Sequence, residues 1–461
     1  MPAEVCAVEK ICVIGLGKLG ACVAAALASR GFQVAGYDVD TRKTEAVRQG
    51  LAPVDEPYLQ ETIENAGARL KASDEIEEAI RESEASFFVL PTPSLPDGSL
   101  SNDFLVPALE SAAKAVREQR KKRHLFVINS TVTPGSLDKV FKPLLEKALQ
   151  GECGRDFGLC YNPQFIALGN VIQGLLAPEF VLIGESDSLS GDLLSQVYKT
   201  LNTNAPPIER MSNVNAELAK ISLNCAVTMK ISFVNQLSGV CSQIPGADPE
   251  VILRAIGKDR RIGPDYLKPG LGFGGPCFPR DNRLFQYVAQ TVGAEAALSQ
   301  ATDKINDDVN LRLVETVLAH SPEGGSVGVL GLAYKPFTSV VDCSAGIWLC
   351  EQLAAAERRV LAHDYVAGMN ASAVLPQGRV RICGDPSEIL QNGCQVLVIT
   401  CPWPGYKEFL QANSDGLSEK RAVIIDPWRL VESVVPTLKN VCYVTRLAPA
   451  ATAVSSEVAH A

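Results

Sequence analysis

The stretch KICVIGLGKLGACVAAALASRGFQVAGYDVD, residues 10–40, carries the strongest structural signal in the chain. An apolar run of strand character enters a GxGxxG glycine pattern, an alanine-rich helix follows, and a second strand ends at Asp38. A lone GxGxxG is weak evidence, but a glycine turn between a strand and a helix, with an acid about 20 residues further on, is the complete dinucleotide fingerprint. The stretch therefore predicts a doubly wound α/β domain that binds a dinucleotide.

The three glycines of this turn have separate physical roles. Gly15 makes the tight turn, Gly17 lets a pyrophosphate approach the backbone, and Gly20 lets the helix pack on the strand. The N-terminus of the helix offers partial positive charge to the anion. We therefore expect the cofactor to contact these glycines and the intervening Lys18 and Leu19.

The choice of cofactor depends on Asp38. Its carboxylate would accept hydrogen bonds from the adenosine ribose and repel a ribose phosphate, which favours NAD over NADP. Arg42 and Lys43 weaken that preference, and Lys43 is itself assigned to the cofactor site. Two further predicted strands, in 86–94 and 125–135, end in turns rich in prolines and hydroxyl groups, for which ordinary capped loops are the alternative. From these turns we assign to cofactor binding Pro91, Thr92, Pro93, Ser130 and Thr131.

Composition excludes several classes of protein. At 461 residues the chain is too long for one core and predicts two or three domains, while 46% hydrophobic and 21% charged residues exclude global disorder. No apolar run reaches the roughly 18 residues of a membrane span. The start, MPAEVCAVEK, lacks a secretory signal, so we expect a cytoplasmic protein without a membrane partner. A net charge of −9 argues against a nucleic-acid partner.

Cysteine and histidine usage argues against a metal site. The 14 cysteines include no CxxC pair, which is typical of reduced thiols and not of a disulfide framework or a zinc ribbon. The four histidines are far apart in the sequence, which argues against a histidine metal site and against a Ser-His-Asp triad. We therefore expect no metal.

One cysteine differs from this background. Cys277 lies in GFGGPCFPRD, residues 272–281, where glycines let main-chain N–H groups approach a ligand and two prolines fix the backbone on both sides of the sulfur. Arg280 can stabilise a thiolate, and Asp281 can orient a water or a cation. Free cysteines are usually small core residues, but this loop predicts an exposed nucleophile.

Residues 212–244 predict one long helix, because apolar side chains recur there at helical spacing. Lys220 and Asn224 interrupt the pattern and share one face, so they could direct a cation and an amide into the same pocket. Spacing alone favours a plainer interpretation, a Glu217–Lys220 pair on a solvated face.

A second series of strand–turn–helix units follows the helical segments. It begins at SVGVLGLAYKP, residues 326–336, and keeps only Gly328 and Gly331 of the glycine pattern. We therefore expect a second doubly wound domain without a second NAD site. The predicted fold is α/β, with two Rossmann-like domains joined by a long central helix and a helical dimerisation segment.

Eight motifs occur in the order found in one enzyme family: GLGKLG, the strand-end Asp38, VLPTP, STVTPG, AELAKISLN, DRRIG, KPGLGFGGPCFPRD and GLAYKP. With them the chain resembles the UDP-glucose/GDP-mannose 6-dehydrogenase family over residues 10–445. The resemblance implies an NAD-binding domain, a homodimer through the central helix, and a C-terminal domain that holds the nucleotide of a nucleotide-sugar substrate. The NAD-binding domain is expected at 1–208, the central helical domain with the Cys277 loop at 209–320 and the C-terminal domain at 321–447. A flexible tail is expected at 448–461.

The resemblance also assigns residues to the site. Cys277 matches the family's thiol nucleophile, which would form a thiohemiacetal and then a thioester during a four-electron oxidation. Lys220 and Asn224 match its oxyanion-stabilising pair, and Asp281 matches an acid that helps to position water. The implied catalytic residues are Cys277, Lys220, Asn224, Asp281 and Gln164. The implied substrate-binding residues are Phe165, Ile166, Lys220, Asn224, Arg261 (reaching into the partner subunit's site), Phe273, Gly274, Gly275 and Lys335.

Four positions depart from the family's pattern. Gln164 and Leu168 lie where members that act on UDP-glucose usually carry glutamates, and a neutral amide cannot take a proton during thioester hydrolysis. Arg280 replaces a commoner lysine, and Asp342 lies where an arginine is common. These departures point to a variant substrate or a slower hydrolytic step.

The sequence therefore leaves four hypotheses. The first is NAD-dependent oxidation of a UDP-hexose, UDP-glucose before others, to the uronate. The second is the same chemistry on GDP-mannose or a UDP-N-acetylhexosamine. A two-electron β-hydroxyacid dehydrogenase and a non-catalytic binder of sugar nucleotides are the remaining two.

Overall fold

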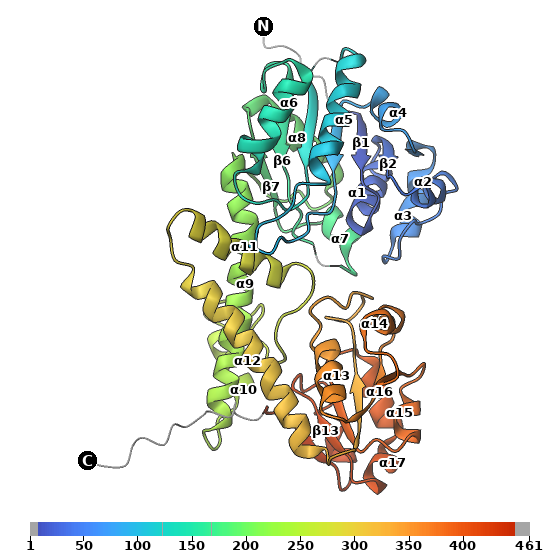
Figure 1. Ribbon diagram of the computed structural model, residues 1–461, viewed down its shortest axis with the longest axis vertical. Helices are drawn as coiled ribbons and strands as arrows, with labels where there is room; N and C mark the ends of the chain where they lie inside the picture. Colours follow the sequence, from blue (N-terminus) through green and yellow to red (C-terminus); the bar gives the residue numbers. More distant parts are fainter. Residues whose placement is uncertain (1–7, 122, 167, 448–461) are drawn as a thin grey trace, which may run out of the picture. The chain divides into compact units, whose positions relative to one another are not determined.

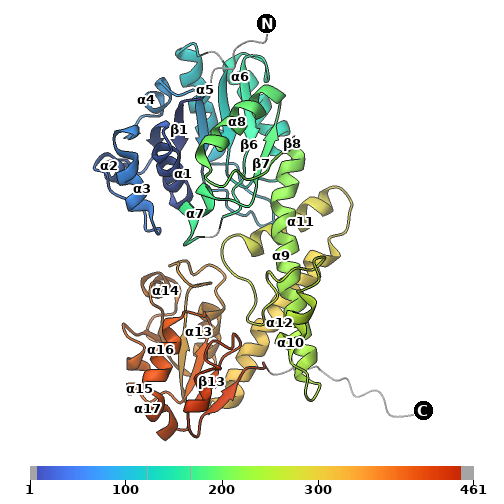
Figure 2. The ribbon, with the colours of Figure 1, turned by 180° about the vertical axis from the view of Figure 1, so that it is seen from behind.

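The computed structural model describes residues 8–121, 123–166 and 168–447, so the predicted tail lies outside the described residues. The chain divides into two compact units, one up to Leu223 and one from Asn224 onwards. The division falls inside helix α9 (Asn213–Ser242). This helix confirms the long helix predicted at 212–244. Each unit contains one sheet with helices packed against it (Figures 1 and 2).

The first unit is built on an eight-stranded sheet in the order β3-β2-β1-β4-β5-β6-β7-β8. Neighbouring strands are parallel except for β6 and β7. The strands are β1 (Lys10–Ile14), β2 (Gln33–Tyr37), β3 (Leu70–Ser73), β4 (Ala85–Phe88), β5 (His124–Ile128), β6 (Phe157–Tyr161), β7 (Val181–Glu185) and β8 (Ile208–Ser212). The strand order reverses between β1 and β4, which is where open α/β sheets bind ligands at their carboxyl edge.

Helices cover both faces of this sheet, and β1 shows why. Ile11 and Val13 pack with α1, α3, α7 and α8, whereas Cys12 and Ile14 pack with α4, α5 and α6, because successive side chains of a strand point to opposite faces. The α-helices of this unit before α9 are α1 (Lys18–Ser29), α2 (Thr41–Arg48), α3 (Leu59–Ala66), α4 (Ile76–Arg81), α5 (Leu105–Glu118), α6 (Lys142–Leu149), α7 (Val171–Leu176) and α8 (Ser188–Leu201).

The second unit joins a helical part to a six-stranded parallel sheet in the order β11-β10-β9-β12-β13-β14. The strands are β9 (Ser326–Leu330), β10 (Arg359–His363), β11 (Val380–Ile382), β12 (Val396–Ile399), β13 (Val423–Ile425) and β14 (Cys442–Val444). Helices α13 (Ala345–Ala355), α14 (Gly368–Val374), α15 (Ser387–Gln391), α16 (Gly405–Ala412) and α17 (Ser414–Glu419) connect them. The order reverses between β9 and β12, which confirms a second doubly wound sheet.

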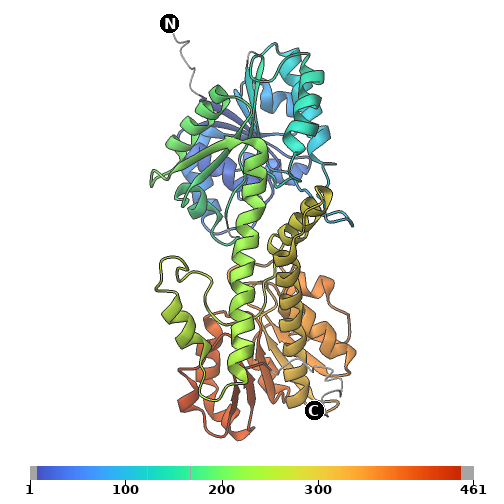
Figure 3. The ribbon, with the colours of Figure 1, turned by 90° about the vertical axis from the view of Figure 1, so that its left-hand side faces the viewer.

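The helical part consists of the second half of α9 with α10 (Pro249–Ile256), α11 (Phe278–Thr291) and α12 (Ala297–His320). Helices α9 and α12 run side by side, and Ser232 Oγ donates to Thr302 O at 3.2 Å (Figure 3). None of the helices within residues 8–447, leaving out 122 and 167, combines the length with the apolar character that a membrane crossing requires.

Candidate active site

The glycine turn after β1 leaves open space at only one of its three glycines. Gly15 has a φ of +98°, and a Cβ there would lie 2.4 Å from the carbonyl oxygen of Val89. A Cβ on Gly20 would lie 1.8 Å from the carbonyl oxygen of Gly15, so packing requires both glycines. Among the described residues, nothing lies within 4 Å of a Cβ built on Gly17, the residue before α1. That space fits a pyrophosphate at the positive end of the helix.

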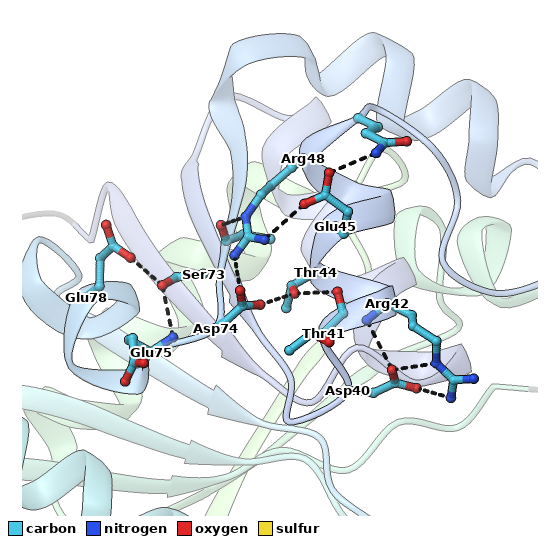
Figure 4. A network of polar contacts seen from close by, with 12 residues as sticks. Asp40, Thr41, Arg42, Thr44, Glu45, Arg48, Ser73, Asp74, Glu75 and Glu78 are labelled. Carbon is cyan, nitrogen blue, oxygen red and sulfur yellow. Dashed lines mark hydrogen bonds and ion pairs between the residues drawn. The ribbon is translucent and has the colours of Figure 1, made fainter.

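Asp38 lies beside this turn with its carboxylate held in place. Its Oδ2 accepts hydrogen bonds from Leu16 N at 2.7 Å and Lys43 Nζ at 3.1 Å. Arg42 is turned back to Asp40, at 2.8 Å between Nη2 and Oδ2 (Figure 4). The Arg42 hydrogen bonds lower the pKa of Asp40 to about 2. One of the two cations near the turn is thus engaged by a different carboxylate, which favours NAD over NADP.

The turns after β4 and β5 are tied to each other by their hydroxyl groups. Ser130 Oγ accepts from Leu90 N at 2.9 Å and donates to Leu90 O at 2.7 Å. Thr92 Oγ1 donates to Thr131 O at 2.7 Å. The Ser130 and Thr92 hydroxyl groups therefore form hydrogen bonds that join the two turns. Contacts of Pro91, Pro93 and Thr131 with a cofactor remain predictions.

The second sheet repeats the geometry of the glycine turn more fully than its sequence indicates. Gly331 has a φ of +111°, and a Cβ on Gly346 would lie 2.2 Å from the Gly331 carbonyl oxygen. Asp364 Oδ2 accepts from Leu332 N at 2.7 Å, as Asp38 does in the first sheet. Gly328 belongs to strand β9, where a Cβ would meet Ile389 at 2.4 Å, so it is a packing residue and not part of the turn.

Gln164 lies just after β6 in a network of polar side chains. Its Nε2 donates to Asn162 Oδ1 at 2.8 Å and to the Tyr198 hydroxyl oxygen at 2.9 Å, while that hydroxyl donates to Asn162 Oδ1. Lys220 Nζ donates to the Gln164 carbonyl oxygen at 2.9 Å and lies 4.7 Å from the centre of the Phe165 ring. The amide at 164 thus meets two oxygen acceptors, a role that a carboxylate cannot fill.

The rest of this segment is anchored by apolar contacts. Ile166 packs closely on Gly174, where a Cβ would lie 3.3 Å from the Ile166 side chain. Leu168 is partly buried against the core that contains α1 and α7. The second position at which the family usually carries a glutamate is therefore a packing position in this chain.

Glu217 contradicts the solvated-face interpretation of its helix. Both Glu217 and Lys220 are buried, and the Glu217 carboxylate accepts from Gly135 N at 2.6 Å and from Leu137 N at 3.0 Å. Burial raises the pKa of Glu217 to about 7 in spite of these hydrogen bonds. Glu217 thus ties the start of α9 to the segment after β5 that contains Gly135 and Leu137.

We expect Glu217→Gln to remove one pH dependence of folding. Because the pKa is raised in the folded state, the folded protein keeps this proton to higher pH than the unfolded chain does. The resulting stability is complete below the unfolded pKa and is lost as the pH rises through about 7. Between pH 6 and 8 the parent should lose about 1.4 kcal/mol more unfolding free energy than the variant. Urea unfolding at both pH values measures the difference, and equal losses would contradict it.

In the second unit, Asp281 holds two of the predicted site residues. Its side chain is fully buried, and its Oδ2 accepts from Asn224 Nδ2 at 2.6 Å. Its Oδ1 accepts from Arg280 Nε at 2.8 Å. The carboxylate is thus occupied by an amide and a guanidinium, which fixes how the Asn224 side chain is turned.

Cys277 is exposed at the residue before α11, which confirms that the loop presents its sulfur. The loop needs its glycines: a Cβ on Gly275 would lie 2.6 Å from the Tyr334 ring, and one on Gly274 would lie 2.3 Å from the Cys343 carbonyl oxygen. Gly275 N also donates to Asp342 O at 2.9 Å. Tyr334 and the 342–343 backbone therefore shape the loop, and their role was not predicted.

Phe273 is tied to α12, since Asn306 accepts from its N–H at 2.7 Å and donates to its carbonyl oxygen at 3.1 Å. Arg261 is an exposed residue paired with Asp259 at 2.7 Å, and Lys335 Nζ lies 5.9 Å from the centre of the Tyr334 ring. Within the described part of the chain, no group of three or more His, Cys, Asp or Glu residues could hold a metal ion.

Comparison with known proteins covers nearly the whole chain. The UDP-glucose/GDP-mannose dehydrogenase family matches as its NAD binding domain over residues 9–202, its central domain over 214–308 and its UDP binding domain over 328–433. The UDP-glucose 6-dehydrogenase of Haloferax volcanii is 31% identical, over 92% of this chain and 97% of its own. A GDP-mannose 6-dehydrogenase of Pseudomonas putida is 32% identical, over 75% of this chain and 78% of its own. The solved UDP-glucose dehydrogenase of Pyrobaculum islandicum is 30% identical with a TM-score of 0.85, covering 97% of this chain and 100% of its own.

Proposed function

Because the chain belongs to the UDP-glucose/GDP-mannose dehydrogenase family, we propose that it oxidises the 6-hydroxymethyl group of a nucleotide sugar to a carboxylate with NAD. The observation that carries this proposal is the exposed sulfur of Cys277, presented by a loop whose glycines are required by close packing. UDP-glucose is the proposed substrate, supported by the match to a UDP binding domain and by the relative from Haloferax volcanii. GDP-mannose is the second candidate, because the relative from Pseudomonas putida is 32% identical over 75% of this chain and residue 164 departs from the usual glutamate.

The proposed reaction removes two hydrides from one carbon. When bound at the glycine turn, NAD supplies the hydride acceptor in each stage. The Cys277 sulfur adds to the intermediate aldehyde because hydride does not leave an aldehyde carbon readily, and the thiohemiacetal is then oxidised to a thioester. Water releases the uronate from the thioester.

Each stage places negative charge on one oxygen, and we assign Lys220 and Asn224 to that oxygen. Donors in such positions are worth about 3 to 4 kcal/mol of transition-state stabilisation. The Asn224 amide has two N–H groups, of which one donates to Asp281, so the other is available to an oxyanion. In this proposal Asp281 is a positioning residue for Asn224 and Arg280.

The test of this function is the number of NADH molecules formed per sugar, measured by absorbance with UDP- and GDP-hexoses in turn. Two NADH per UDP-glucose are expected, with the uronate as product. Two NADH from GDP-mannose or a UDP-N-acetylhexosamine alone would select the second candidate. One NADH per substrate would indicate a two-electron dehydrogenase. Thermal stabilisation by a sugar nucleotide without any NADH would indicate a non-catalytic binder.

We also propose that α9 and α10 form a homodimer interface. Three large apolar side chains of α9, Met229, Phe233 and Val240, are between 41% and 51% exposed. Ile244, after the end of α9, and Val251 of α10 are also about half exposed. Several large apolar side chains exposed on neighbouring helical segments favour association over exposure to water.

Phe233→Asp should therefore convert the dimer into a monomer, because the substitution would bury a charge at the interface. Analytical ultracentrifugation measures the change in mass. Met369→Asp is the matched control, since Met369 is 86% exposed on α14 and lies outside α9 and α10. A parent that sediments as a monomer, or a dimer that withstands the Phe233 substitution, would contradict the proposed interface.

A further inference from the structure

A cavity in the second unit lies apart from the thiol and is lined by three arginines. They are Arg312 of α12, Arg429 after β13 and Arg446 after β14. The rest of the wall includes Gly239 of α9, Pro269 and Gly270. Among the described residues that line it, none is acidic. We call it the three-arginine cavity.

Arg312 is built into this wall without a carboxylate partner. Its side chain is half-buried, and a Cβ on Gly239 would lie 2.7 Å from its Nη1. A glycine inside a helix is destabilising relative to alanine. The close approach of Arg312 is a local reason for a glycine at 239, because any larger side chain would meet the guanidinium. The guanidinium donates from Nε to Asp308 O at 3.3 Å and forms no ion pair with any residue that the structure describes. Its two terminal nitrogens are left for an acceptor from outside the protein.

The side chains of the other two arginines both contact one short segment, residues 247–250. Arg446 Nη2 donates to Ala247 O at 2.8 Å and, like Arg312, has no carboxylate partner among the described residues. Arg429 is paired with Asp248 at 3.1 Å and with Glu250 at 3.2 Å, so its charge is compensated. Two of the three arginines at the cavity therefore form no ion pair with a residue that the structure describes.

We propose that the three-arginine cavity binds an oxyanion of the phosphate class. Its volume of about 40 Å³ fits one small group. Several guanidinium groups from separate elements suit a tetrahedral anion with many acceptor oxygens better than a planar carboxylate, which one guanidinium can satisfy.

The bound anion would support the loop that carries the thiol. Pro269 and Gly270 line the cavity at the start of that loop, and Asn235 Nδ2 donates to Leu271 O at 3.2 Å from the cavity side of α9. An anion held by Arg312 and Arg446 would therefore stiffen 269–271 from behind. In this proposal the anion supports the backbone of 269–271, which leads into the Cys277 loop.

Binding is tested without turnover, so its outcome is independent of the proposed enzyme activity. Inorganic phosphate is titrated at constant ionic strength against chloride, with calorimetry and the melting temperature as readouts. Saturable binding with a higher melting temperature is expected for the parent. Arg312→Gln and Arg446→Gln should each weaken the phosphate affinity by at least about tenfold, as the loss of one charge-assisted contact predicts. Arg381→Gln is the matched control, because Arg381 is exposed and paired with Glu388 at 2.9 Å on the far edge of the second sheet.

Gly239→Ala is a second variant that keeps the fold, since its Cβ would displace only the flexible end of Arg312. It should weaken phosphate binding without lowering the melting temperature. Glycerol 1-phosphate distinguishes the sources: binding as tight as that of inorganic phosphate assigns the site to a phosphomonoester, and weaker binding assigns it to the free anion. Unchanged phosphate affinity in both Arg312→Gln and Gly239→Ala would overturn the proposal. Competition between phosphate and a nucleotide sugar would also overturn it, because the cavity would then be part of the substrate site.

Discussion

Cys277→Ala should lower the rate of uronate formation by at least about 10³-fold, the scale on which loss of a covalent nucleophile acts. Without the sulfur, no thiohemiacetal forms. The second hydride then cannot leave readily, because the aldehyde carbon carries no added nucleophile. The first oxidation needs no thiol, and the NADH yield should therefore fall from two to at most one per sugar. Stopped-flow absorbance of NADH with chromatographic assay of the uronate measures both quantities.

A second exposed thiol provides the control for this experiment. Cys442 is exposed at the start of β14, in the same unit as Cys277 but on the edge strand of the second sheet. Cys442→Ala should keep two NADH per sugar and the parent rate. Uronate release by Cys277→Ala within tenfold of the parent would remove the thioester route. The family membership and the fold would be unaffected, because they rest on other residues.

The parts of the molecule that could be predicted are those encoded by neighbours in sequence. The glycine turn, the strand before it and Asp38 lie within 30 residues, and each requirement is local: a positive φ, a close approach or a helix start. The long helix followed in the same way from apolar spacing over 212–244. The exposed sulfur followed from the glycines and prolines around it.

The supports of the site could not be predicted, because they come from residues far apart in the chain. Asn306 holds the Cys277 loop from 33 residues away, and Tyr334 packs on Gly275 from a different strand–turn unit. The Glu217 contacts with 135 and 137 span about 80 residues and reversed the solvated-face interpretation. Spacing within one helix shows which residues share a face, but not which distant backbone groups they meet.

Gln164 has a physical consequence that follows from its partners. Its Nε2 donates to Asn162 Oδ1 and to Tyr198, and the oxygen of Asn162 can only accept. A glutamate at 164 would face that oxygen with a second acceptor and remove one of its three donors, while Tyr198 and Asn129 would still donate to it. The chain therefore has an amide that fits its surroundings and cannot act as a base. General-base catalysis contributes about 10² to 10⁴-fold, so thioester hydrolysis should be the slow stage of the proposed reaction.

The parent enzyme should accordingly show a burst of two NADH per site, followed by slow turnover, with the acyl adduct on Cys277 visible by intact mass. Gln164→Glu should raise the slow rate by about 10-fold or more, because a carboxylate near Asn162 can accept the proton of the attacking water. The same variant should lower the melting temperature, since the Asn162 oxygen loses one of its three donors and faces a carboxylate in its place. Gln173→Glu, at an exposed position of α7, adds the same charge outside the network and should change neither quantity. A parent without a burst or an adduct would show that hydrolysis is fast without a carboxylate at 164, and the base would then have to be sought among other groups.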